Sequence, residues 1–106
     1  MPTVQEIFAE LPNRVDTSKL AGIDMSILFD LSGDGGGQWT LVVADSTINV
    51  DNSAGDDPTA TLKMAASDWQ AMATGKLNPM TAFMTGKVKV EGDLSAVMKM
   101  QSFMPN

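Results

Sequence analysis

The chain has 106 residues, which is enough for one folded domain but not for two, because domains cluster at about 100 to 150 residues. With 43% apolar and 19% charged residues, its composition is that of a globular domain, which excludes an intrinsically disordered chain. The lack of cysteine and histidine excludes disulfides, thiolate catalysis and the commonest metal ligand, and the net charge of −6 argues against nucleic-acid binding.

The first predicted element is a short helix. Thr3 and Glu6 have the spacing of a capping box, in which each residue satisfies a free backbone N–H of the other. The apolar residues behind this cap recur at helical spacing and form one stripe: Val4, Ile7, Phe8 and Leu11. We expect this helix to end near Pro12, and a second short turn or helix to begin at Asp16 or Thr17 and to stop at Gly22.

From residue 23 the apolar residues recur at every second position, which is typical of a half-buried strand over residues 23–31. The glycine cluster at residues 33–37 then predicts a hairpin turn, and the alternation resumes at residues 39–43. Two further strands are predicted at residues 48–50 and 60–64. Four consecutive strands favour an antiparallel meander.

The C-terminal part is predicted to be mostly helical. Ser67 with Gln70, and Asn78 followed by Pro79, are typical helix starts, so two short helices follow each other. Residues 88–91 alternate as a fifth strand, and a last helix runs from Leu94 to about residue 104. This order predicts one α+β domain over residues 1–106, with helices covering one face of a mostly antiparallel sheet.

The polar clusters offer weak candidates for a site. The glycines at 33–37 lack the ending of a phosphate-binding loop and precede a strand, so a hairpin turn is the better interpretation. The acidic loop at 51–57 does not have the spacing of a calcium loop, and the aspartates of the strands are expected on the solvated face. We therefore predict no catalytic residue, no metal and no cofactor. Residues 1–62 contain ten acidic and two basic residues, and residues 63–106 contain three and five, so only the C-terminal half is suited to a small anion.

Methionine is concentrated in the C-terminal half, where seven of the nine occur. Methionine fills irregular cores and also lines adaptable binding surfaces, so this count alone favours plain core packing. On a helical wheel, however, the apolar residues of the last helix spread over roughly 220°, whereas packing on a sheet requires only about 100°. The excess is to be covered by a ligand or by a partner chain. Gln101 lies within this arc, where it would meet a ligand headgroup or cap a backbone group.

Residues 68–94 resemble the sterol carrier protein type 2 family. The shared features are Gly-Lys-Leu-x-Pro at 75–79, Ala-Phe-x-x-Gly-Lys at 82–87, an alternating basic strand at 87–91, and Gly-Asp at 92–93 before the final helix. All four occur in order at matching spacing. The resemblance extends more loosely upstream, where the strand ending at Leu31, the glycine-rich turn and Trp39 match the first hairpin of the family, and the first helix matches only by type.

The resemblance implies a five-stranded sheet that is covered on one face by helices and encloses an apolar tunnel. It implies a protein, not an enzyme, that binds lipids such as fatty acids, fatty acyl-CoA or sterol-like molecules, and it leaves open whether the protein transfers them or only stores them. The alternative is an interaction module that buries its methionine-rich helical face in a homodimer or partner. The expected ligand-binding residues are Phe29, Leu41, Ile48, Trp69, Met72, Met80, Phe83, Met84, Val97, Met98, Gln101 and Phe103.

The sequence also bears on location and partners. No apolar run approaches the ~20 residues that cross a bilayer, and the N-terminus lacks the features of a secretory signal. We expect a cytoplasmic monomer or weak homodimer that makes transient membrane contact without stable insertion. The ending Phe103-Met104-Pro105-Asn106 differs from the Ser-Lys-Leu type address of peroxisomal members, so import into peroxisomes is not predicted.

Overall fold

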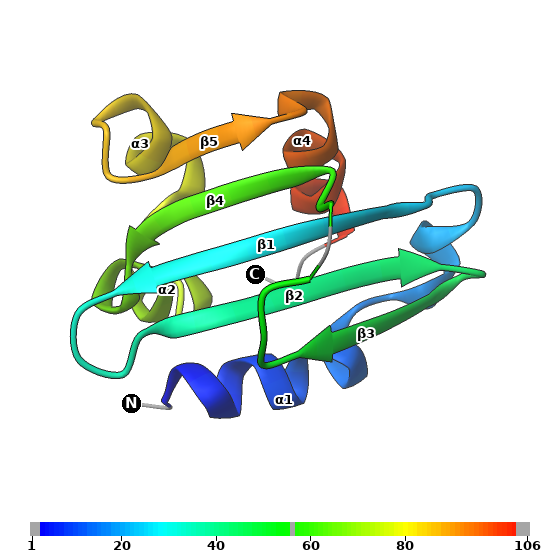
Figure 1. Cartoon of the computed structure of the whole chain (residues 1–106), viewed down its shortest axis with the longest axis horizontal. Coiled ribbons are helices and arrows are strands. Elements are labelled where there is room, and N and C mark those ends of the chain that lie inside the picture. The colour runs from blue at the N-terminus through cyan, green and yellow to red at the C-terminus, as the bar shows by residue number, and fades with distance from the viewer. Residues whose placement is uncertain (1–2, 56, 104–106) are drawn as a thin grey trace.

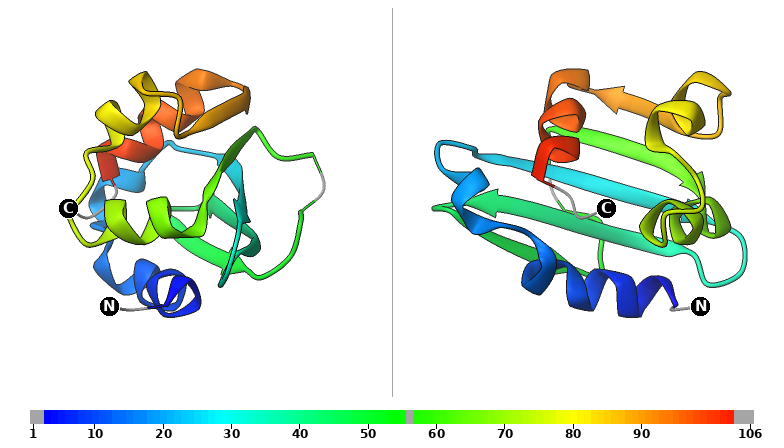
Figure 2. Two further views of the ribbon diagram at one scale, coloured as in Figure 1. Left: turned by 90° about the vertical axis from the view of Figure 1, so that its left-hand side faces the viewer. Right: turned by 180° about the vertical axis from the view of Figure 1, so that it is seen from behind.

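Five strands form a single sheet in the order β3-β2-β1-β4-β5, with the helices on one face (Figures 1 and 2). The computed structural model describes residues 3–55 and 57–103, except for the side chains of Pro79 and residues 101–103. The elements in chain order are α1 (Val4–Arg14), the 3-10 helix η1 (Thr17–Leu20), β1 (Met25–Ser32), β2 (Gly37–Ala44), β3 (Thr47–Asp51), β4 (Ala60–Ala65), α2 (Ala66–Ala73), α3 (Pro79–Met84), β5 (Lys89–Gly92) and α4 (Leu94–Phe103). The predicted α+β class and the mostly antiparallel sheet are confirmed.

The prediction of a four-stranded meander is wrong, because β4 lies beside β1 and not beside β3. The β1–β2, β2–β3 and β4–β5 pairs are antiparallel, whereas β1 and β4 are parallel. The loop after β3 crosses the sheet and is fixed beside the start of β1: Thr59 N donates to the Ser26 carbonyl at 2.8 Å, and Ser26 N donates to Thr59 Oγ1 at 3.1 Å. An alternating pattern identifies a strand but not its partner.

The two hairpins follow from turn chemistry. Between β1 and β2, Gly33 and Gly35 both have positive φ, and Gly36 N donates to the Gly33 carbonyl at 3.0 Å, so the predicted glycine turn is confirmed. Between β2 and β3, Asp45 and Ser46 both have positive φ, as a two-residue type I′ turn requires. The acidic loop is anchored differently: the buried hydroxyl of Thr40 donates to the Ser53 carbonyl at 2.7 Å.

The predicted starts of α1 and α3 are confirmed, whereas the predicted cap of α2 is wrong. The capping box of Thr3 and Glu6 is present, and Asn78 Oδ1 accepts from Met80 N at 2.8 Å at the start of α3. Ser67 does not cap α2, because β4 passes directly into the helix at Ala65 and leaves no loop for a capping side chain. The expected end of α1 near Pro12 is confirmed to within one helical turn. The helix continues to Arg14 because the fixed φ of proline fits the last turn, at the loss of one backbone hydrogen bond.

An aromatic cluster forms the centre of the core between α1, α2 and the sheet. Phe8 lies between the rings of Trp39 and Trp69, with centroid distances of 5.1 and 4.9 Å and interplanar angles of 13° in both cases. Phe29 from β1 contacts Phe8 edge-on at 5.2 Å. The predicted apolar stripe of α1 therefore faces inward, since all four of its residues are buried. No helix of the described chain is long and apolar enough to cross a membrane.

Candidate functional site

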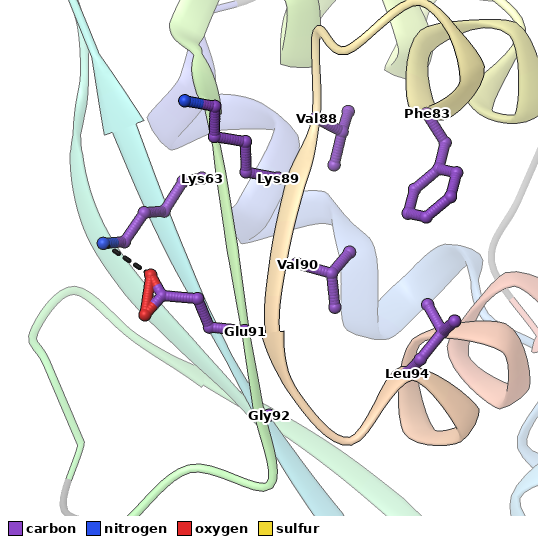
Figure 3. A pocket seen from close by; sticks show the side chains of 8 residues that line it. All are labelled: Lys63, Phe83, Val88, Lys89, Val90, Glu91, Gly92 and Leu94. Atoms are coloured by element: carbon purple, nitrogen blue, oxygen red, sulfur yellow. Dashed lines mark ion pairs between the residues drawn. The ribbon is translucent and has the colours of Figure 1, made fainter.

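An open groove of about 710 Å³ lies between α3, β5 and the start of α4 (Figure 3). Its apolar wall is built from three elements: Phe83 of α3 points down, Leu94 of α4 points up, and Val88 and Val90 project between them from the strand side. Val88 is buried and Val90 is half-buried, whereas Phe83 and Leu94 are exposed. The remaining lining residues are Lys63, Lys89, Glu91 and Gly92.

The strand alternation separates the apolar and charged parts of this site. Val90 of β5 and Val88, which directly precedes this strand, project toward the helices, and Lys89 and Glu91 project to the opposite side (Figure 3). Glu91 forms an ion pair with Lys63 of β4 at 2.6 Å, and its hydrogen bond raises the pKa of the Lys63 ammonium above the ordinary value. The charged groups therefore border the groove without entering its apolar wall.

The two helices that flank the groove are fixed at their N-terminal ends. Asn78 caps α3, and the carboxylate of Asp93 accepts from Ser95 N at 2.9 Å and from Ser95 Oγ at 2.6 Å at the start of α4. These two hydrogen bonds lower the pKa of the Asp93 carboxyl below its ordinary value. Leu94 thus enters the groove from a position that is set by its neighbours on both sides.

Helix α4 has two apolar faces. Ala96, Val97 and Met100 are buried against the rest of the domain, and α4 contacts β1, β4 and η1. Leu94 and Met98 lie one turn apart on another side of the helix and are 45% and 62% exposed. The wide apolar arc of the sequence thus corresponds to one packed face and one face open to solvent.

The ten expected ligand-binding residues whose side chains the structure describes lie at different depths, and one of them, Phe83, lines the groove. Phe29, Leu41, Ile48, Trp69 and Val97 are buried in the core, and Met72 is half-buried beside it. Phe83 lines the groove. Met80, Met84 and Met98 are exposed. The side chains of Gln101 and Phe103 lie outside the described part of the chain.

Three residues of the apolar wall were missed by sequence reasoning: Val88, Val90 and Leu94. The alternation of residues 87–91 already placed both valines on one face of a strand, and Leu94 is the first residue of the wide apolar arc. The missing information was that the edge strand β5 leaves this face open between two helices.

As to metals, the described residues contain no group of three acidic, cysteine or histidine side chains arranged to hold an ion.

The fold and the groove define a small α+β domain that offers an apolar site to a hydrophobic molecule. The model of the SCP-2 sterol transfer family matches residues 4–105, so the chain belongs to this family. Membership places it in a class of proteins that bind and transfer lipids.

Its relatives are mostly larger proteins. The chain is 30% identical to human hydroxysteroid dehydrogenase-like protein 2 over 102 residues, covering 95% of this chain and 24% of that protein. It is 31% identical to rat sterol carrier protein 2, covering 91% and 19%. Both alignments span a quarter or less of the relative. Among solved structures, palmitated SCP2L2 from Aedes aegypti superposes with a TM-score of 0.81 at 20% identity, covering 95% of this chain and 93% of that one.

Proposed function

We propose that this chain binds lipids with a long apolar tail, fatty acids and their acyl-CoA esters first among them, and performs no chemistry on them. The observation that carries this proposal is the apolar groove between α3, β5 and α4. Its volume of about 710 Å³ falls within the range of about 300 to 1,000 Å³ that is typical of small-molecule sites. Family membership supports the same class of ligand.

The groove supports affinity through the tail more than through the headgroup. Each methylene transferred from water contributes about 0.8 kcal/mol, so a tail of about twelve methylenes provides on the order of 10 kcal/mol before ordering costs. Lys63 and Lys89 lie on the other side of β5 from the apolar wall, and Lys63 is engaged by Glu91. The described residues that line the groove therefore provide no dedicated partner for a headgroup, and we expect broad specificity among lipids.

Two features favour an acyl chain over a rigid sterol. The wall consists of four side chains from three separate elements along an open groove, which a flexible chain follows more easily than a fused ring system. One structural neighbour of this fold, SCP2L2 from Aedes aegypti, is named as palmitated. Sterol-like ligands remain within the proposed range because other relatives are named sterol carrier protein 2.

The test is displacement of a fluorescent fatty acid from the wild-type protein and from Leu94→Asp. Leu94 is the first residue of α4, where a carboxylate is favourable to the helix, so this variant is expected to fold. It places a charge in the apolar wall and removes a buried contact with the tail. We expect the affinity to fall about ten- to a hundredfold, which corresponds to the burial of one leucine side chain.

The matched control is Leu28→Asp. Leu28 lies on the opposite face of the sheet, between Thr40 and Thr61 on the neighbouring strands, so this change should leave the affinity unaltered. Wild-type affinity in a folded Leu94→Asp variant would place the ligand elsewhere. Native mass spectrometry of the same samples addresses the interaction-module alternative, because a dimer that neither contains nor takes up lipid would contradict the proposal.

A further inference from the structure

Strand β5 forms one edge of the sheet, so only one of its two sides is paired, with β4. Asp93 N donates to the carbonyl of Thr59, which lies directly opposite in this antiparallel register, at 3.1 Å. Directly bonded positions recur at every second residue of such a pair, so Glu91 and Lys89 also bond to β4. The N–H and C=O groups of Val90, which lies between them, therefore point away from β4 to the open edge.

The surroundings leave this edge accessible to another strand. Figure 1 shows β5 as the outermost strand, with α3 near the end where it begins and α4 at the end where it finishes. Within the described chain, no backbone group of a loop or helix bonds to Val90. The apolar groove runs beside β5, and Phe83 and Leu94 remain exposed there. The site thus offers free main-chain groups next to apolar side chains, which are the two requirements of strand addition.

The charged side of β5 carries one charge of each sign. Lys89 and Glu91 are two residues apart, both are exposed, and both project away from the apolar wall of the groove (Figure 3). Residues directly opposite each other on neighbouring strands interact, and opposite charges there are favourable whereas like charges are not. A strand with this spacing of charges is complementary to a second copy of itself that runs antiparallel.

One antiparallel register of two β5 strands is favoured by these charges. The outward-pointing main-chain groups of both strands must meet, which requires the two-fold axis to pass at a residue and not between two residues. An axis at Lys89 sets this lysine opposite its own copy, and an axis at Glu91 sets two carboxylates opposite each other. An axis at Val90 instead sets Lys89 of each copy opposite Glu91 of the other.

We propose that this chain forms a two-fold dimer in which the β5 strands of two copies pair antiparallel about Val90 and join the two sheets. The two copies of Val90 exchange a pair of main-chain hydrogen bonds, and Lys89 pairs with Glu91 of the second copy on each side of the axis. Because the strands run antiparallel, the α3 end of one copy lies next to the α4 end of the other. The exposed Phe83 and Leu94 then lose contact with water.

The other edge of the sheet is not suited to the same pairing. Helices α1 and η1 contact β3. The exposed side chains of this strand are Thr47, Asn49 and Asp51, which include no cation, so two β3 strands would gain no charge pair. Pairing of β5 with β3 of another copy would use a different surface on each partner and would not close on itself, whereas pairing of β5 with β5 does.

The dimer is tested on lipid-free protein, so the result does not depend on lipid binding. Sedimentation equilibrium of the wild-type chain should show an average mass that rises toward twice the monomer mass as the protein concentration is increased. A wild-type protein that remains monomeric up to about 1 mM would overturn the proposal. Loss of fatty-acid binding in the groove would contradict the proposed function but would leave the dimer unaffected.

Charge exchange tests the register. Lys89→Glu and Glu91→Lys should each weaken self-association on the order of tenfold or more, because each sets like charges opposite each other at two symmetric positions. An equimolar mixture of the two variants should restore the dimer, since one strand then carries two carboxylates and the other two ammonium groups. The controls Arg14→Glu and Glu10→Lys make the same changes in charge on exposed positions of α1 and should leave the association unaltered.

A main-chain variant tests the pairing itself. Val90→Pro removes an N–H that points to the open edge, where proline is tolerated in a sheet, so the monomer should fold and the dimer should be lost. Val90→Ile retains this N–H and should dimerise as the wild type does. Circular dichroism verifies the fold of each variant. A dimer that survives Val90→Pro, or a mixture of the two charge variants that remains monomeric, would overturn the proposed interface.

Discussion

Phe8 contacts three other aromatic rings and is itself fully enclosed by α1, α2 and the sheet. Its ring joins Trp39 of the sheet to Trp69 of α2, so that a single side chain connects two layers of the domain. Aromatic pairs at such distances contribute about 0.5–1.5 kcal/mol each beyond the burial of their area. The side chain of Phe8 is therefore expected to be among the most costly in the chain to truncate.

Phe8→Ala should lower the free energy of unfolding by about 3–5 kcal/mol, the usual range for loss of a buried phenylalanine. Urea denaturation measures this change. Gln5→Ala on the exposed side of the same helix is the control and should change stability by less than about 0.5 kcal/mol. A loss of only about 1 kcal/mol in Phe8→Ala would mean that the stacked cluster is not formed as described.

Gly92 combines two constraints at the junction of β5 and α4. Its φ is 88°, in the left-handed region, and a Cβ placed on it would lie 2.8 Å from the carbonyl oxygen of Thr59. Gly75 has a similar φ of 79° but has open space around the same position. Comparing alanine substitutions at Gly75 and Gly92 therefore distinguishes the cost of backbone strain from the additional cost of a steric clash.

Gly75→Ala should cost about 1–2 kcal/mol, the strain of a side chain in the left-handed region. Gly92→Ala should cost at least about 1 kcal/mol more, because the backbone near Thr59 must also move. Thermal denaturation of both variants under one set of conditions gives the difference. Equal losses in the two variants would show that Thr59 yields without cost.

At the level of the elements, two helices begin with the same cap. Asp16 accepts from Ser18 N and Oγ at the start of η1, as Asp93 does from Ser95 at the start of α4. In both cases hydrogen bonds from the serine lower the pKa of the carboxyl. Because the folded-state pKa lies below the unfolded value of about 3.9, each carboxylate stabilises the fold fully above that value and progressively less as the pH falls through the folded pKa.

We therefore expect the stability to decline as the pH is lowered from about 5 toward 3, and Asp93→Asn to make this decline shallower. Ser95→Ala, which removes the hydroxyl donor, should act in the same direction. Urea midpoints across this pH range provide the measurement. An unaltered pH dependence in Asp93→Asn would show that this cap does not couple protonation to folding.

The tripeptide Asp-Leu-Ser occurs twice and shows that three residues alone do not determine secondary structure. At residues 30–32 it ends the strand β1, and at residues 93–95 it begins the helix α4. The sequence distinguished the two through context, since alternation precedes the first and a glycine precedes the second. Most helices and strands were predictable in this way. The partner of β4 and the start of α2 were not, because they depend on how a loop crosses the sheet and on a strand passing directly into a helix.

For the whole molecule, class and family were accessible from sequence because the spaced glycines, lysines and aspartate of residues 75–94 are specific. The location of the groove was not accessible from the sequence. The wheel correctly indicated more apolar surface on α4 than one contact uses, but periodicity does not state which part remains open. Exposure in the folded chain separates Val97, in the core, from Leu94, in the groove, although both lie in the same arc.

The arrangement of Trp39 and Trp69 on either side of Phe8 determines what ultraviolet spectroscopy reveals of this protein. The chain has no tyrosine, so these two indoles dominate its near-ultraviolet absorbance and its intrinsic fluorescence. Both occupy one buried cluster, and neither lines the groove. Intrinsic tryptophan fluorescence thus reports on unfolding of the core. Unaltered fluorescence in a groove variant indicates that the core is intact, whereas binding of a ligand in the groove must be followed with an added chromophore.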